Sequence, residues 1–322
     1  MAFLHFFLLF AGIITAAWLL SYGAEIFAER WGANFVGSVV LGLVTTLPEY
    51  LFVIWASIKG RYEMAVGSAI GACSLLVTLG YGMVILVATS RLSRQPVREI
   101  ELSQTTSVDA FYLMLTAGVA FFLSWEGGGL DLKDSVILIG LFLGYVAHLS
   151  HEAYKFSQAL AEENVFKGSL VKACIFVFAG AVMVFLLAEP FVDSMVEISH
   201  AMGVSPVTIA VVLGPLASEM PEKMTAYITV HRDAKLAEIS VCNFIGSAVN
   251  HNSLLLGTLP IVALFHGQRQ VPGVLSASFV LMTIVTVIAT LSLRRRRLQR
   301  WESAMFLALY ALVIAEAFQR TR

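Results

Sequence analysis

The chain has 322 residues, of which 58% are apolar and only 13% are charged, about half the charged fraction of a soluble globular domain. The mean hydropathy of +0.81 and the net charge of −1 exclude a soluble globular protein, a disordered chain and a protein that binds nucleic acid through a basic surface. The chain is therefore predicted to be an integral membrane protein that has the lipid bilayer as its main partner.

Apolar segments follow one another along the whole chain. The first continues to about Tyr22 and lacks the basic residues of a signal peptide, which predicts a membrane span rather than a cleaved leader. Because a spanning helix needs about 20 mainly apolar residues, ten spans are predicted, at about 3–23, 34–57, 63–89, 108–124, 134–153, 169–190, 204–229, 236–265, 272–293 and 303–318. The eighth is long enough to be tilted, kinked or broken.

Two polar connections interrupt this apolar pattern. The connection at 125–134 is short, whereas the one at 151–168 is longer and amphipathic. The longer one separates five spans from five. We therefore predict two five-helix units, 1–150 and 169–322, joined by a cytoplasmic loop at 151–168.

The basic residues are unevenly shared between the two sides of such a bundle. With ten alternating spans, 14 of the 21 Lys and Arg residues lie in loops on one side and 6 on the other, and Lys223 lies inside a span. The positive-inside rule assigns the richer side to the cytoplasm. This predicts a multi-pass protein of a prokaryotic-type plasma (inner) membrane, with both termini extracytoplasmic.

An internal repeat relates the two halves. The second span contains GLVTTLPEYLF (42–52) and the seventh contains GPLASEMPEKMTA (214–226), each with a hydroxyl residue ahead of Pro-Glu. In the next span of each half, GSAIGACS (67–74) aligns with CNFIGSAV (242–249). Because each half has an odd number of spans, the copies are opposite in orientation. The predicted fold is an all-α membrane protein of ten helices in two inverted repeats, with broken helices at the midplane.

The Pro-Glu segments are the candidate site. Pro48 and Pro221 are predicted to break their helices at mid-depth, where irregular backbone persists only if it is buried in protein or lines a wet cavity. Exposed carbonyls and hydroxyls are hard oxygen ligands for cations. The predicted ligands are the carboxylates of Glu49 and Glu222 and the hydroxyls of Thr45, Thr46 and Ser218. The alternative is a kink whose glutamate bonds a neighbouring helix.

Polar residues on the glycine segments extend this candidate site. Ser68, Asn243 and Ser247 can face it, whereas the glycines themselves are expected to serve close helix contact. His251 is either a satisfied core histidine or a titrating or ligating group.

Two carboxylates that face each other in a medium of low dielectric constant repel each other. A divalent cation relieves that repulsion, and so do two monovalent cations or protons. The three cysteines, Cys73, Cys174 and Cys242, show no CxxC spacing, and no GxxxxGK[ST] pattern occurs. We expect no resident cofactor, no nucleotide and no nucleic acid partner, and small inorganic cations as the transported load.

These paired segments resemble the α-repeats of the calcium/cation antiporter superfamily, particularly the prokaryotic sodium/calcium exchangers, in which the repeats read approximately GTSLPE followed by GNxxGSNxx(N/D). The resemblance covers most of the chain. It implies that the central acidic ligands are Glu49 and Glu222, and that Thr45, Thr46 and Ser218 supply hydroxyl or backbone ligands. The glycine-serine element falls on Gly246 and Ser247.

The chain departs from that family pattern at several positions. Ala72 replaces a serine, and Leu76 and His251 replace the later Asn or Asp ligands. Glu219 adds a carboxylate, which is either a ligand or a neighbour of one. Lys223 adds an ammonium, which is expected to snorkel, to pair with Glu219 or to occupy the place of an ion.

The resemblance and the residues together predict a secondary antiporter that exchanges Ca²⁺ or a related cation for Na⁺ or H⁺ by alternating access, and not an enzyme. One alternative is a degenerate relative with a structural or regulatory role and no transport. Another is an intramembrane hydrolase, which lacks support because neither paired aspartates nor an HExxH helix occurs. The oligomeric state is not predicted.

Overall fold

The fold is seen in a computed structural model that describes residues 2–31, 46–160 and 169–319. Most of these residues are helical. The helices of the first half are α1 (Ala2–Trp31), α4 (Leu47–Ile58), α5 (Tyr62–Leu75), α6 (Tyr81–Ala88), α7 (Gln104–Gly127) and α8 (Leu132–Leu160). Those of the second half are α9 (Leu170–Met202), α10 (Pro206–Arg232), α11 (Ala237–Asn250), α12 (Leu256–Phe265), α13 (Ala277–Arg294) and α14 (Arg300–Gln319).

Eight helical segments in the described ranges are long and apolar enough to cross a membrane, and α4 and the first part of α10 are shorter apolar helices. The predicted all-α, multi-pass membrane fold is confirmed. The count of ten stays a prediction, because part of the second predicted span (34–57) lies outside the described residues. Helix α8 also continues to Leu160, so residues 151–160 of the predicted connecting loop are helical, and 161–168 lie outside the described residues.

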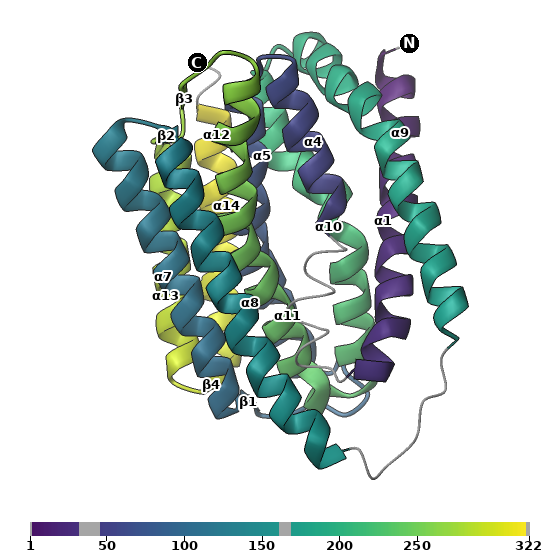
Figure 1. The fold of residues 1–322 in the computed structure, drawn as a ribbon. Coiled ribbons are helices and arrows are strands. Elements are labelled where there is room, and N and C mark those ends of the chain that lie inside the picture. The colour runs from purple at the N-terminus through teal and green to yellow at the C-terminus, as the bar shows by residue number, and fades with distance from the viewer. Residues whose placement is uncertain (1, 32–45, 161–168, 320–322) are drawn as a thin grey trace.

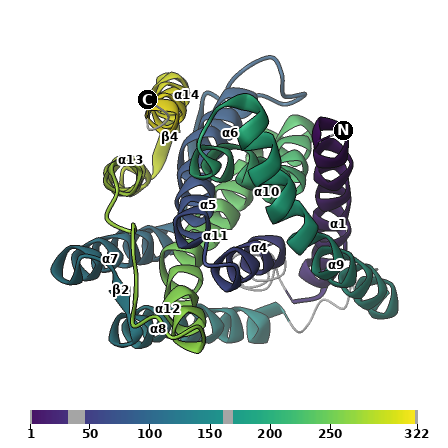
Figure 2. The same ribbon diagram turned by 90° about the horizontal axis from the view of Figure 1, so that it is seen from above.

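The helices form a single bundle in which α5 and α11 lie in the middle (Figures 1 and 2). Helices α7, α8, α13 and α14 lie on one side of this centre, and α1 and α9 lie on the other. The two ends of the described chain lie at the same end of the bundle (Figure 1). Antiparallel strand pairs link the two halves at the loops, β1 (Glu99–Glu101) with β4 (Arg297–Gln299) and β2 (Leu130–Asp131) with β3 (Gln270–Val271).

Two π-helical turns interrupt the central helices. They are η2 (Leu76–Gly80), between α5 and α6, and η4 (His251–Leu255), between α11 and α12. The repeat alignment pairs their first residues, since Leu76 and His251 each follow the aligned glycine by five positions. A π-turn is rare and occurs frequently at functional sites. The long eighth span is thus interrupted at His251.

Small residues allow the closest helix contacts. A Cβ atom on Gly71 of α5 would lie 2.2 Å from the backbone oxygen of Val211 in α10. Helices α1 and α9 cross in the same manner, because a Cβ atom on Gly180 would meet Ala16 and Leu20 at about 3 Å. The predicted role of such glycines in helix contact is confirmed for Gly71.

The two Pro-Glu segments differ from each other. Helix α4 begins at Leu47, so Pro48 occupies its first turn, where a missing N–H costs no ladder bond. Helix α10, by contrast, continues through Pro221 to Arg232. The predicted break at Pro221 is therefore wrong, because neighbouring helices in a membrane bundle can compensate for one lost ladder bond.

Candidate cation-binding site

The candidate site is a buried polar cluster where α4, α5, α10 and the start of η4 meet. Its centre is Glu49, which lies in the first turn of α4 and is 1% exposed. The hydroxyl of Ser68 in α5 donates a 2.8 Å hydrogen bond to Oε1 of Glu49, and Ser218 in α10 donates a short hydrogen bond to Oε2. Both serines were predicted site residues, and the structure places both on this carboxylate.

Two further groups converge on this point. One carboxylate oxygen of Glu49, one of Glu219 and a ring nitrogen of His251 lie within 4.8 Å of one another, and all three residues are buried. Ligands bound to one Ca²⁺ at 2.3–2.6 Å can lie at most about 5 Å apart. The spacing of the three atoms is therefore compatible with a shared cation.

The hydrogen bond on the other side of the His251 ring indicates which nitrogen faces the cluster. Nδ1 lies 2.6 Å from the carbonyl oxygen of Ser247, and a carbonyl can only accept, so Nδ1 carries a proton. Nε2 lies 3.5 Å from Oε1 of Glu219. Among the described residues, neither Nε2 of His251 nor Oε1 of Glu219 has a hydrogen-bond partner.

A second polar network fixes the start of α4 to the end of α11, next to the π-turn. Nδ2 of Asn250 donates a 2.8 Å hydrogen bond to the hydroxyl of Thr46, and the Tyr50 hydroxyl donates to Oδ1 of Asn250 at 2.5 Å. Thr46, a predicted ligand, accepts the bond from Asn250. Tyr50 and Asn250 were not predicted, although each is the sequence neighbour of a predicted residue, Glu49 or His251.

The remaining predicted residues are placed as follows. Asn243 is buried in α11, where its Oδ1 has no partner among the described residues, and it makes none of the cluster contacts described above. Ser247 contributes its backbone carbonyl to His251. Thr45 lies outside the described residues, and so does the side chain of Glu222, although its backbone belongs to α10. Glu219, rather than Glu222, is therefore the described acid that lies beside Glu49.

The space around Glu49 is small and closed. A cavity of about 10 Å³ adjoins Glu49, Ser68 and Ser218, and its apolar wall comes from Ile13 of α1 and Phe191 of α9. A cavity of this volume holds about one water molecule. Helices α1 and α9 thus cover the cluster with apolar side chains.

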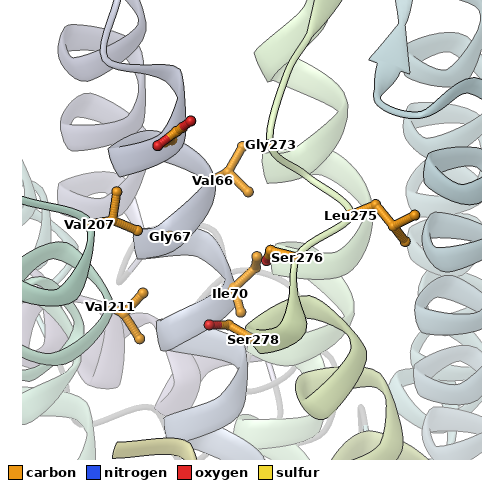
Figure 3. A pocket seen from close by; sticks show the side chains of 10 residues that line it. Val66, Gly67, Ile70, Val207, Val211, Gly273, Leu275, Ser276 and Ser278 are labelled. Carbon is orange, nitrogen blue, oxygen red and sulfur yellow. The ribbon is translucent and has the colours of Figure 1, made fainter. Parts of the chain in front are cut away.

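A larger cavity, of about 280 Å³, lies between α5, α10 and the segment before α13 (Figure 3). Its wall includes Gly67 of α5 and Val211 of α10, and Glu63 also contributes to the lining. Gly67 directly precedes Ser68, which binds Glu49. The cavity therefore extends to within one residue of the cluster along α5.

Comparison with known proteins identifies the family. The profile of the sodium/calcium exchanger protein family matches residues 1–150 and 172–318. The chain belongs to this family. The resemblance inferred from the two repeats is thus confirmed, and the exchanger family is one of transporters rather than enzymes.

Relatives and solved structures of this exchanger-family chain cover nearly its whole length. The membrane protein MJ0091 of Methanocaldococcus jannaschii is 26% identical over 92% of the chain and 94% of its own length. The putative antiporter CaxA of Alkalimonas amylolytica is 22% identical over 90% of each. The crystal structure of the H⁺/Ca²⁺ exchanger CAX has a TM-score of 0.78 at 20% identity, covering 99% of the chain and 86% of that structure.

A second solved structure, the sodium-calcium exchanger NCX_Mj soaked with 2.5 mM Na⁺ and 10 mM Sr²⁺, has a TM-score of 0.70 at 23% identity. It covers 98% of the chain and 99% of that structure. At these identities the two structures establish the fold of the exchanger-family chain, and the chemistry must be argued from its own residues.

Proposed function

We propose that this chain is a secondary cation antiporter whose load binds at Glu49, Glu219 and His251, and that it exchanges Ca²⁺ or a related cation for Na⁺ or H⁺. The proposal rests on family membership and on one observation, the convergence of three buried electron-pair donors. Each of these groups can accept positive charge, and their ligand atoms lie within 4.8 Å of one another.

The unpartnered atoms argue for a positive load. With its proton on Nδ1, the neutral form of His251 would direct the lone pair of Nε2 toward the Glu219 carboxylate. Two acceptors that face each other inside a protein are unfavourable unless a cation or a proton lies between them. Such a load satisfies both atoms at once, because each supplies a lone pair.

The same cluster explains why exchange would be coupled. Carboxylates are costly in the membrane interior unless they are compensated, so each load has to be replaced by another before the cluster becomes favourable again. Three protein ligands are fewer than the six to eight oxygens that Ca²⁺ takes. We expect water and the Ser218 hydroxyl to supply the rest. The apolar cover from α1 and α9 would have to move aside for either load to leave.

The test measures flux in proteoliposomes. The wild-type chain should take up ⁴⁵Ca²⁺ when a Na⁺ or pH gradient is imposed, and Glu49→Gln should reduce the rate at least about tenfold, because it removes a charge that binds the load. Glu126→Gln is the matched control, since Glu126 is exposed at the end of α7. Flux through Glu49→Gln at the wild-type rate would contradict the proposal.

One observation favours a second candidate, a member of the family that does not transport. Lys223 forms an ion pair with Glu219, 3.2 Å apart, and so already compensates one of the carboxylates. A non-transporting protein would bind no cation saturably, so calorimetric titration of purified protein with Ca²⁺ and with Na⁺ distinguishes the two candidates.

A further inference from the structure

Lys223 places a fixed positive charge beside the cluster. Its Nζ lies 3.2 Å from Oε2 of Glu219, one helical turn earlier in α10, and both side chains are only 1% exposed. Lys223 therefore does not snorkel toward solvent, and the expected pairing with Glu219 is the arrangement observed. Nζ also lies 5.8 Å from the centroid of the Phe244 ring, within the range of a cation–π contact.

The two oxygens of Glu219 have different roles. Oε2 binds Lys223, whereas Oε1 faces Nε2 of His251 and has no hydrogen-bond partner among the described residues. The carboxylate thus connects the ammonium to the place where the load is proposed to bind. The ammonium and the load share one carboxylate, so their charges repel each other across it.

Charge counting in the cluster shows the consequence. The described carboxylates, Glu49 and Glu219, carry two negative charges when ionised, and Lys223 carries one positive charge. One monovalent cation then completes the balance, whereas a divalent ion leaves an excess of positive charge in a buried place. Without the ammonium, the same two carboxylates would match a divalent ion.

We propose that Lys223 is a resident counter-ion of the exchange site, which takes the place of one mobile positive charge and thereby favours monovalent over divalent cations. This rests on the proposed function in one respect, that the mobile load binds at the same cluster. Lys223 does not touch the load. It acts through Glu219 and is a specificity-determining residue.

The test is equilibrium binding to the full-length protein in detergent, measured with ⁴⁵Ca²⁺ and by competition with Na⁺. Lys223→Met removes the charge at similar volume and should raise the affinity for Ca²⁺, relative to that for Na⁺, at least about tenfold. Lys223→Arg keeps the charge and should retain the wild-type ratio. In Glu219→Gln combined with Lys223→Met, the gain should disappear, because the carboxylate that the ammonium compensated is also absent.

A purely structural ion pair makes a different prediction. It implies that Lys223→Met lowers stability and leaves the Ca²⁺/Na⁺ ratio within about twofold of the wild type, and that result would overturn the inference, as would an equal gain in Lys223→Arg. A gain in affinity cannot arise from misfolding. Should Lys223→Met not elute as a monodisperse protein, Lys223→Gln removes the charge and still offers Glu219 a hydrogen bond.

Measurements of flux and cation binding can also distinguish a failure of this inference from a failure of the proposed function. A wild-type chain without flux or saturable binding, together with a Lys223→Met variant that binds Ca²⁺, would support the resident counter-ion and overturn antiport. A wild-type chain that exchanges cations, together with an unchanged ratio in Lys223→Met, would support antiport and overturn the resident counter-ion.

Discussion

Each oxygen of the Glu49 carboxylate accepts a hydrogen bond from a serine on a different helix. Ser68 belongs to α5 and Ser218 to α10, so the carboxylate joins one helix from each half of the chain. Hydrogen bonds to a charged group contribute about 1.5–3 kcal/mol each. The two serines therefore hold the charged carboxylate in one orientation with respect to Glu219 and His251.

Ser68→Ala tests this orientation. The variant removes the donor to Oε1, and we expect it to weaken cation binding by about tenfold, which corresponds to about 1.4 kcal/mol. Ser74→Ala is the matched control, because Ser74 is buried on the same helix and its hydroxyl has no hydrogen-bond partner in the described part of the chain. Calorimetric titration of both variants provides the comparison, and equal affinities would argue against a role for Ser68.

For single residues, the sequence predicts which side chains belong to the site, but it predicts less well which of them pair with each other. Glu49, Ser68 and Ser218 were predicted site residues, and His251 was left open between a core role and a ligating one. The structure brings the four together. The pairing of Lys223 with Glu219 follows from their i, i+4 spacing, but their deep burial depends on the tertiary position of α10. Periodicity could not show that Glu219 faces the cluster, because α10 carries acidic residues at both 219 and 222.

Helices α5 and α10 touch at a position that tolerates no side chain. The contact lies at Gly71, whose missing Cβ leaves room for the backbone of Val211. It is close in sequence to Ser68 and Ser218, the two donors to Glu49. The distance between these helices therefore affects both stability and the shape of the site.

Gly71→Ala should separate the two helices. An added Cβ atom would lie 2.2 Å from the carbonyl oxygen of Val211, and such overpacking costs about 1–3 kcal/mol. We expect a lower melting temperature in scanning fluorimetry and weaker cation binding. Gly118→Ala, in α7, is the control, because a Cβ atom there would meet nothing within 4 Å. Equal melting temperatures for the two variants would show that the crossing can adjust.

The secondary structure around the two prolines shows that the local sequence alone does not determine whether a helix ends at a proline. Proline predicts a helix boundary equally at both sites, yet α4 begins beside Pro48 and α10 continues through Pro221. Whether a proline ends a helix depends on the neighbours that replace the lost bond. The local sequence does not specify those neighbours. The long helices, by contrast, could be predicted because the apolar runs that indicate them are local.

The ion pairs at one end of the bundle connect α9 with the turn between α4 and α5. Lys59 binds Glu189 at 3.2 Å and also contacts Asp193, which binds Arg61 at 3.0 Å. Partial burial lowers the pKa of Lys59, but the two carboxylates outweigh it and the pKa is raised overall. These pairs hold α9 against the turn that follows α4, the helix that carries Glu49. They are half-exposed, so salt would weaken them.

The orientation of the whole bundle stays a prediction and can be measured. A reporter fused after residue 319 should behave as extracytoplasmic, because the basic residues are concentrated on the opposite side. Alkaline phosphatase fused there should be active, and green fluorescent protein fused there should not fluoresce. Fusions after residue 160 should give the reverse pattern. The same pattern at both positions, or the reversed pattern, would contradict the assignment of the termini.

The two π-helical turns store one surplus residue in each central helix. One residue corresponds to a rotation of about 100° around an α-helix. If the π-turn shifted by one residue along the chain, the side chains at the shifted position would rotate about the helix axis while the helix stayed intact. His251 is the first residue of η4, so such a step would swing its imidazole away from Glu219. A core of this kind can change what its acids face by a local rotation, while the surrounding bundle keeps its shape.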